Sequence, residues 1–209
     1  MIRTIAFTLA VFLAAALPAA ASTISFSQTD FGDFVSNDIA ITTTGTWSQM
    51  QLITHGLADG DVYQHNFGGE APPNPALVAS FADLAFDTFL ANGTLVDAPA
   101  TNGILAIGGA VNLGGSAGKQ FGTHNLNVTW GPALGQNPTD IVNWLAARIT
   151  LADTANGTFK LLSSDTSDGK GMQIIDNGLI VNGAMMVPEP STFLMLAVGS
   201  LGLLLLRRK

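Results

Sequence analysis

Hydrophobic residues follow two patterns along this chain. Each end carries a mostly apolar run, over residues 5–17 and 193–206, whereas between the ends hydrophobic and polar residues alternate in short stretches. The alternation is cleanest where single polar residues separate Leu126, Val128 and Trp130. Successive side chains of a strand point to opposite faces, so a period of two predicts half-buried strands. We therefore predict a β-structured middle flanked by two segments of a different kind.

The alternating stretches predict roughly eight to ten short strands joined by turns rich in Gly, Asn and Asp. They are expected at residues 22–26, 39–53 with a break near Gly45, 84–90, 104–113, 125–130, 145–151, 158–162, 172–175 and 179–181. The last two are expected to form a hairpin about the turn Asp176-Asn177-Gly178. This spacing predicts an all-β fold, an antiparallel two-sheet β-sandwich of jelly-roll-like form.

Three segments are less regular. Leu77–Leu90 fits both helical and strand spacing, and its aromatic and Thr content favours a strand after Asp83. A helical turn is expected at Ile141–Trp144, just before a strand. His55–Pro75 is rich in Gly and Pro and is predicted to be a long loop, of the kind that is often functional.

Length and composition indicate one folded unit between two targeting segments. The predicted boundaries are 1–21 for a signal peptide, 22–186 for the sandwich body and 187–209 for a C-terminal sorting signal. A body of this length buries a core without covalent cross-links, and the chain contains no cysteine. Disulfide and thiol chemistry are therefore excluded.

The body is strongly acidic. Residues 22–187 contain four Lys and Arg side chains and fourteen Asp and Glu side chains, a formal charge of −10. Such a balance repels nucleic acid, and no basic cluster in the body offsets it. We expect no nucleic-acid binding.

The N-terminus has the three parts of a secretory signal peptide. Arg3 precedes the apolar run, and Pro18 and three alanines follow it. Small residues at this position mark a cleavage site, which we place between Ala21 and Ser22. The alternative, an uncleaved anchor, is disfavoured because the apolar run is short.

The C-terminus combines a stiff motif, an apolar helix and a basic tail. Pro188 and Pro190 hold an extended backbone that presents Glu189. The predicted membrane helix runs from Phe193 to Leu206, and at 1.5 Å per residue it spans about 21 Å, short of the hydrocarbon core of about 30 Å. It suits a transient anchor in the inner membrane better than a permanent one. The basic tail favours the cytoplasmic side and comprises Arg207, Arg208 and Lys209.

Together with the signal peptide, this ending resembles the PEP-CTERM sorting signal of exopolysaccharide-producing Gram-negative bacteria. The resemblance implies recognition by an exosortase, a membrane-embedded transpeptidase-like enzyme. It also implies an inner membrane-anchored precursor with a periplasmic body, followed by the cell surface or the extracellular space. The sorting motif would comprise recognition residues of a substrate rather than catalytic residues, namely Val187, Pro188, Glu189 and Pro190.

Acidic clusters suggest weak metal-site candidates. The predicted loop carries two imidazoles and three carboxylates, at His55, Asp59, Asp61, His65 and Glu70, but their spacing matches no zinc motif. Calcium is the cation that clustered carboxylates would favour, and the chain otherwise suggests no cofactor. The candidate calcium ligands are Asp59, Asp61, Asp165 and Asp168. Solvated, turn-forming Asp residues are the simpler interpretation.

Exposed aromatic side chains would suit a carbohydrate surface. Trp47 and Tyr63 are the candidates for stacking on sugar rings, although Trp47, which has polar neighbours, could equally anchor the core. Trp130 is expected in the core because it alternates with apolar positions. The main hypothesis is a non-enzymatic protein of the extracellular matrix or biofilm that is associated with exopolysaccharide, in a structural or carbohydrate-binding role. The alternative is a secreted glycan hydrolase that uses loop carboxylates, which would need a defined carboxyl separation.

Overall fold

The computed structural model of the protein describes residues 22–93, 104–133, 135–165 and 172–188. Ten strands and three short helices lie within them. The strands are β1 (Ser22–Phe31), β2 (Phe34–Thr43), β3 (Trp47–His55), β4 (Phe89–Leu90), β5 (Ile104–Gly108), β6 (Asn127–Pro132), β7 (Trp144–Ala152), β8 (Gly157–Asp165), β9 (Met172–Val181) and β10 (Ala184–Met186). The helices are α2 (Pro75–Val78), η1 (Ala82–Phe86) and η2 (Val111–Leu113).

The predicted targeting segments fall outside this part of the chain. The signal peptide at residues 1–21 and the membrane helix at residues 193–206 are not among the described residues. Within the described ranges, no helix has both the length and the apolar character needed to cross a membrane.

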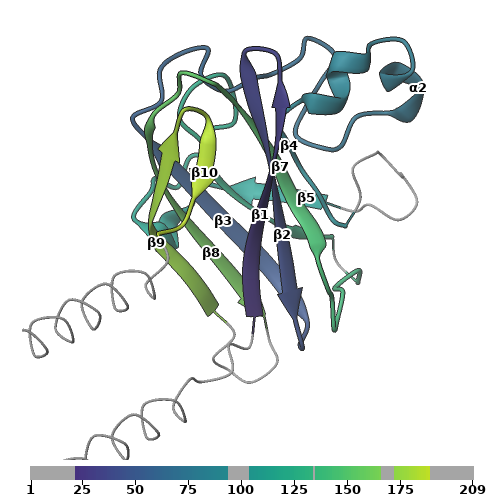
Figure 1. Cartoon of the computed structure of the whole chain (residues 1–209). Helices are drawn as coiled ribbons and strands as arrows, with labels where there is room; N and C mark the ends of the chain where they lie inside the picture. Colours follow the sequence, from purple (N-terminus) through teal and green to yellow (C-terminus); the bar gives the residue numbers. More distant parts are fainter. Residues whose placement is uncertain (1–21, 94–103, 134, 166–171, 189–209) are drawn as a thin grey trace, which may run out of the picture.

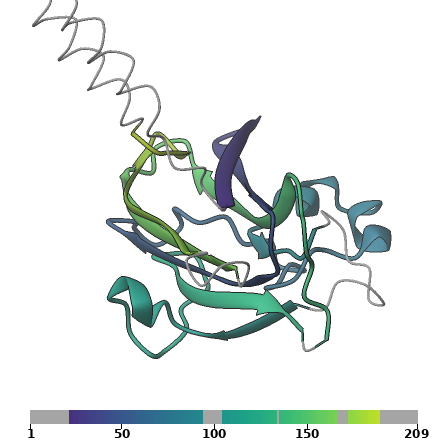
Figure 2. The ribbon, with the colours of Figure 1, turned by 90° about the horizontal axis from the view of Figure 1, so that it is seen from below.

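The strands form two sheets that face each other, as the two views in Figures 1 and 2 show. The four-stranded sheet has the order β1-β2-β7-β4, and the six-stranded sheet has the order β10-β9-β8-β3-β6-β5. All strand pairs are antiparallel. The predicted two-sheet antiparallel sandwich is confirmed at this level.

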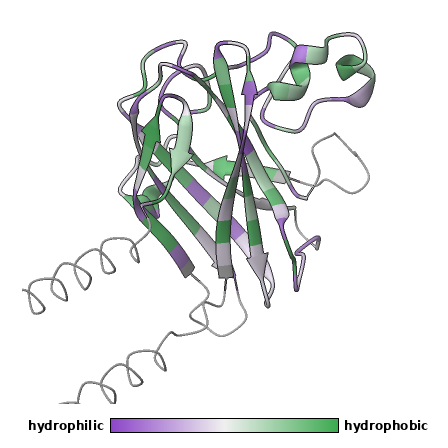
Figure 3. Cartoon of the chain, in the orientation of Figure 1, coloured by the Kyte–Doolittle hydropathy of each residue, from purple (hydrophilic) through white to green (hydrophobic). Residues whose placement is uncertain are grey.

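The core lies between the sheets and contains the largest side chains of the body. Trp130 from β6 is fully buried, and its indole nitrogen donates a 2.8 Å hydrogen bond to the Ala146 carbonyl in the opposite sheet. Apolar and polar positions alternate along the strands, and Figure 3 shows this as bands of colour. Other fully buried members of the core include Trp47, Met50, Leu52, Leu126 and Phe159.

The predicted hairpin about Asp176-Asn177-Gly178 is wrong. β9 continues through these residues, and its pairing with β8 shifts register where Phe159 lies opposite Gly178. Asp176 and Asn177 of β9 therefore lie opposite the single residue Lys160 of β8, which makes a bulge. Gly178 is needed there because a β-carbon at that position would lie only 2.3–2.6 Å from three ring carbons of Phe159. A turn-like sequence is thus absorbed inside a strand.

The strand predicted after Asp83 is also wrong over most of its length. Residues 82–86 form the 3₁₀ helix η1, and only Phe89 and Leu90 pair with β7. The Arg148 guanidinium donates a 2.6 Å hydrogen bond to the Ala85 carbonyl, so a tertiary contact holds the helical turn.

The helical turn predicted at Ile141–Trp144 is absent. Asp140 and Asn143 have φ angles of 52° and 50°, which a right-handed helix does not allow. Two other predictions are confirmed: β2 and β3 are separated near Gly45, and no helix or named strand occurs between His55 and Pro75.

Candidate functional site

The C-terminal segment leaves the sandwich from β10, an edge strand of the six-stranded sheet. β10 is joined to β9 by a two-residue turn in which Val181 pairs with Ala184. The turn residues Asn182 and Gly183 have φ angles of 49° and 76°. Positive φ at both central positions is the geometry of a type I′ hairpin, for which Asn-Gly is a preferred sequence. The chain therefore reverses tightly and runs back along β9 before it reaches the predicted sorting motif.

A buried amide in the other sheet holds β10 in place. Asn37 on β2 is fully buried, and its side-chain nitrogen donates hydrogen bonds to the carbonyls of Ile149 (3.1 Å) and Gly183 (2.8 Å). Its side-chain oxygen accepts a 2.8 Å hydrogen bond from the backbone nitrogen of Met185. Gln28 on β1 adds a 2.9 Å hydrogen bond to the Met185 carbonyl. Both sheets therefore fix the last strand of the body.

The chain becomes exposed immediately after this anchor point. Met185 is fully buried, whereas Met186, Val187 and Pro188 are exposed. The first two residues of the predicted sorting motif are thus accessible on the surface. Its remaining residues lie outside the described part of the chain, together with the basic tail at 207–209. At the other end, Ser22 is the first residue of β1, and Ala21 is not described.

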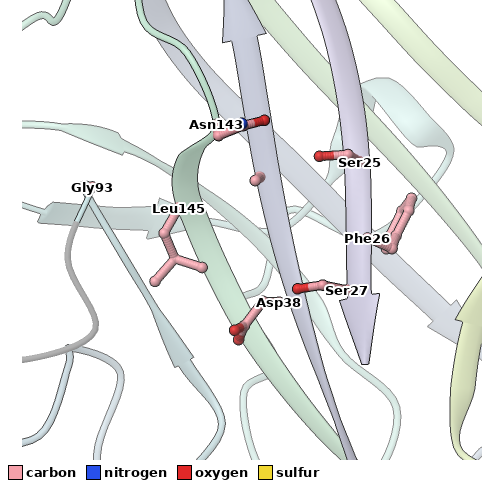
Figure 4. A pocket seen from close by; sticks show the side chains of 8 residues that line it. Ser25, Phe26, Ser27, Asp38, Gly93, Asn143 and Leu145 are labelled. Carbon is pink, nitrogen blue, oxygen red and sulfur yellow. The ribbon is translucent and has the colours of Figure 1, made fainter. Parts of the chain in front are cut away.

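The outer face of the four-stranded sheet contains a hollow of about 450 Å³. Figure 4 shows Ser25 and Ser27 of β1 beside it, with Asp38 of β2 and Asn143 and Leu145 across the sheet. Sheet register explains this gathering, because Ser25 is opposite Ala40, Ala40 is opposite Leu145, and Ser27 is opposite Asp38. Hydroxyl, carboxylate and amide groups therefore surround an aliphatic floor.

The negative charge of Asp38, beside the hollow, is neutralised by Arg148. Arg148 contacts Asp38 through two nitrogens, at 2.6 and 2.8 Å. The guanidinium also lies 6.0 Å from the ring centre of Phe86 and 5.8 Å from that of Phe89. Paired charges held between aromatic rings are rigid and present little net charge. The hollow is consequently polar without being strongly anionic.

Three of the acids predicted as metal ligands lie in the described part of the chain, and each has a separate partner. Thr123 donates its hydroxyl hydrogen to Asp59, and the backbone nitrogen of Ala58 donates a 2.7 Å hydrogen bond to Asp61. Asp165 is buried and accepts a 2.6 Å hydrogen bond from the Thr43 hydroxyl. Asp168 lies outside the described residues.

Sheet register keeps two of these positions far apart. Asp165 pairs with Trp47 at the start of β3, whereas the loop that carries Asp59 follows His55 at the other end of that strand. Nine residues of strand span roughly 27 Å. Among the described residues, no three His, Cys, Asp or Glu side chains form a group that could hold a metal ion. The calcium site therefore stays a prediction.

Glu70 and His65, also in the loop, have partners of their own. Glu70 forms an ion pair with Lys119, with 2.6 Å between the closest charged atoms, and His65 lies 3.6 Å from the Asp83 carboxylate. The carboxylates of Asp59, Asp61 and Glu70 thus each bond to a different group.

The carbohydrate prediction for Trp47 needs correction. Its side chain has no exposed surface and packs in the core between the sheets, so it is not available to a ligand on the surface. Tyr63 is half-buried, with its ring 5.7 Å from that of Phe31 and 4.9 Å from that of Phe34. The exposed aromatic pair on the described surface is instead Phe67 and Phe81, whose ring centres are 4.8 Å apart.

A buried carboxylate that the sequence did not single out organises this loop. Asp87 is fully buried and accepts hydrogen bonds from the backbone nitrogens of His65 (2.7 Å) and Gly69 (3.1 Å). Burial raises the pKa of the Asp87 carboxyl, although these hydrogen bonds oppose the increase. Burial, followed by the charges of Asp83 and Asp87, raises the pKa of Tyr63. In the sequence, only the two consecutive glycines at 68–69 indicated that another group packs closely against the backbone there.

Comparison with known proteins identifies the C-terminal segment. The family model described as "PEP-CTERM protein-sorting motif" matches residues 187–209. No curated protein and no solved structure matches the chain.

Proposed function

We propose that this PEP-CTERM sorting domain-containing protein is a non-enzymatic component of the extracellular matrix, where its sandwich associates with exopolysaccharide. The motif indicates a protein that an exosortase sorts, by way of export and a membrane-anchored precursor. Processing then separates the body from its anchor, and the body acts at the cell surface or beyond it.

The position of the motif relative to the fold carries this proposal. The last anchored residue is Met185, and the motif begins only two residues later, at Val187. An enzyme in the membrane can therefore reach the motif without unfolding a strand. Cleavage after Met186 would leave every described hydrogen bond of Asn37 intact, so the released body would keep its fold.

The hollow on the four-stranded sheet supports the carbohydrate part of the proposal. Its volume of about 450 Å³ lies within the range of small-molecule sites, about 300–1,000 Å³. Ser25, Ser27 and Asn143 offer hydrogen-bonding groups to sugar hydroxyls, and Leu145 offers an apolar contact for the C–H face of a ring. Because the body is acidic, we expect neutral glycans to bind better than anionic ones.

The proposal of a non-enzymatic role rests on the hydrogen bonds that the candidate carboxylates make to other groups of the protein. In a glycosidase two carboxyl groups face a shared substrate, whereas Asp59, Asp61 and Glu70 bond to three different partners. We expect incubation with polysaccharide from the producing cells to release no new reducing ends. Release that disappears in an Asp59→Asn or Glu70→Gln variant would instead establish the hydrolase.

Replacing Pro188, Glu189 and Pro190 together with alanine tests the sorting step. We expect the full chain to accumulate in the membrane fraction at its precursor mass, because the recognition residues are gone while the apolar run remains. Pro75→Ala is the matched control, since Pro75 is an exposed proline at the start of α2, remote in sequence from the motif. Normal processing of the triple variant would reject the proposal.

A further inference from the structure

A patch of exposed aliphatic side chains surrounds the point where the chain leaves the sandwich. Leu179 and Val181 of β9 are 41% and 39% exposed, and Met186 and Val187 are 44% and 38% exposed. We call these four residues the exit patch. Leu179 pairs directly with Met186, so their side chains lie on the same face of the sheet. Figure 3 shows the hydrophobic colouring of the β9–β10 hairpin.

The exit patch is uncharged within an acidic body. Residues 177–188 contain no Asp, Glu, Lys or Arg. The flanking charged residues are Asp176, whose carboxylate lies 2.9 Å from the Lys160 nitrogen, and Glu189 of the sorting motif. Bacterial and other membranes that contain anionic lipid repel acidic surfaces, but an uncharged aliphatic surface meets no such barrier. The patch therefore differs from the rest of the body in a way that suits contact with lipid.

The length of the tether places this face of the body close to the bilayer. Only residues 187–192 separate β10 from the apolar run that begins at Phe193, and six extended residues span at most about 20 Å. A body of 165 residues, 22–186, has a radius of gyration of about 15 Å. The tether is thus scarcely longer than the radius of the body, and Asn37 fixes the residue from which it starts.

We propose that, in the membrane-anchored precursor, the exit patch rests on the lipid surface that holds the C-terminal segment. The contact is intramolecular once the tail is anchored, so a small apolar area is sufficient. It would orient the body with the β9–β10 edge toward the bilayer and the sorting motif at the depth of a membrane-embedded enzyme. Cleavage removes the tether, and the weak contact alone then does not retain the body. This inference rests on the membrane-anchored precursor of the proposed function.

The absence of cysteine makes a direct test simple. Single variants Leu179→Cys and Val181→Cys of the full chain are labelled with an environment-sensitive fluorophore and reconstituted through the tail into vesicles that contain nitroxide-labelled lipid. Val142→Cys is the matched control, because Val142 is 72% exposed and lies just before the start of β7. The β9–β10 turn, by contrast, lies beside the end of β7. Nine residues of strand separate the two ends by about 27 Å.

We expect nitroxide lipids to quench the labels at 179 and 181 at least about threefold more strongly than the label at 142, because quenching falls steeply with distance. Equal quenching at the three positions, in protein that floats with the vesicles, would overturn the patch proposal and leave the anchored precursor standing. Protein that does not float with the vesicles would overturn both the patch proposal and the membrane-anchored precursor. If the label at 179 is instead protected in detergent, and more so as protein concentration rises, a second copy occupies the patch and the proposal fails.

Discussion

The side-chain oxygen of Asn37 accepts a 2.8 Å hydrogen bond from the backbone nitrogen of Met185, 148 residues later in the chain. The same side chain donates to the carbonyl of Gly183 in the β9–β10 turn, so a single buried amide satisfies an acceptor in that turn and a donor on the strand that precedes the sorting motif. A side-chain amide offers this pair of functions in the same plane, as a peptide group does. Through Asn37, β2 holds β10 on the edge of the opposite sheet.

Asn37→Ala should therefore destabilise the body substantially. It leaves the Met185 amide and the Gly183 carbonyl without their partners in a buried site, and we expect a loss of about 2–4 kcal/mol in the free energy of unfolding. Urea unfolding monitored by tryptophan fluorescence measures it. Asn177→Ala is the control, because Asn177 is exposed in the β9 bulge. If both variants unfold at the same urea concentration as the parent chain, Asn37 does not hold β10.

Gly178→Ala tests the packing of the bulge. The added β-carbon would lie 2.3–2.6 Å from three ring carbons of Phe159, whose side chain is fully buried. Overpacking of this kind costs about 1–3 kcal/mol. Gly69→Ala is the matched control, since a β-carbon there meets no atom within 4 Å. Thermal melts of the two variants should differ by several degrees, and equal melting temperatures would contradict the register that we describe.

The extent to which the sequence predicted the fold depends on the range of the interactions. Alternation is a local signal, and it located β6 around Val128 and Trp130, although the strand is buried on both faces and not half-buried as the alternation predicted. The Asp176-Asn177-Gly178 bulge was mistaken for a turn because its cause, the ring of Phe159, lies on a neighbouring strand. The true hairpin turn at Asn182 and Gly183 was visible in the sequence as Asn-Gly, and a local rule would have found it.

The candidate sites show the same division. The sorting motif is a contiguous segment, so residues 187–209 were identified from the sequence alone. The hollow and the Asp38–Arg148 pair depend on strands that are more than a hundred residues apart. The polar neighbours of Trp47 left both an exposed and a buried position open, and in the structure its side chain is fully buried in the core. Contacts between the two sheets leave no periodic pattern of hydrophobic residues in the sequence.

Asp87 should make stability depend on pH in a specific direction. Burial raises the pKa of Asp87 in the folded protein above its unfolded value, near 3.8. At pH values between these two pKa values, the folded state keeps the Asp87 proton and the unfolded state releases it. Stability contributed by the neutral carboxyl is present below pH 3.8 and is lost as pH rises through the folded pKa.

An Asp87→Asn variant isolates this effect, because the amide does not titrate. Losing one acceptor oxygen adds an offset that is independent of pH. The free energy of unfolding of the parent chain minus that of the variant should therefore fall as pH increases from about 3.8, and then become constant. Urea titrations at a series of pH values measure it. A difference that rises with pH would show that the hydrogen bonds from His65 and Gly69 outweigh burial.

Ser25→Trp tests the carbohydrate site by filling the hollow. Ser25 is exposed, so the new indole can extend over Leu145 without entering the core, and the fold should survive. We expect binding of neutral polysaccharide from the producing cells to weaken about tenfold or more, a loss of about 1.4 kcal/mol, because the space for a sugar ring is occupied. Thr158→Trp adds the same side chain to an exposed position on the other sheet and should bind like the parent chain. Affinity electrophoresis in gels that contain the polysaccharide compares the three. Equal retardation of all three would mean that glycans contact another surface, for which the exposed pair Phe67 and Phe81 is the next candidate.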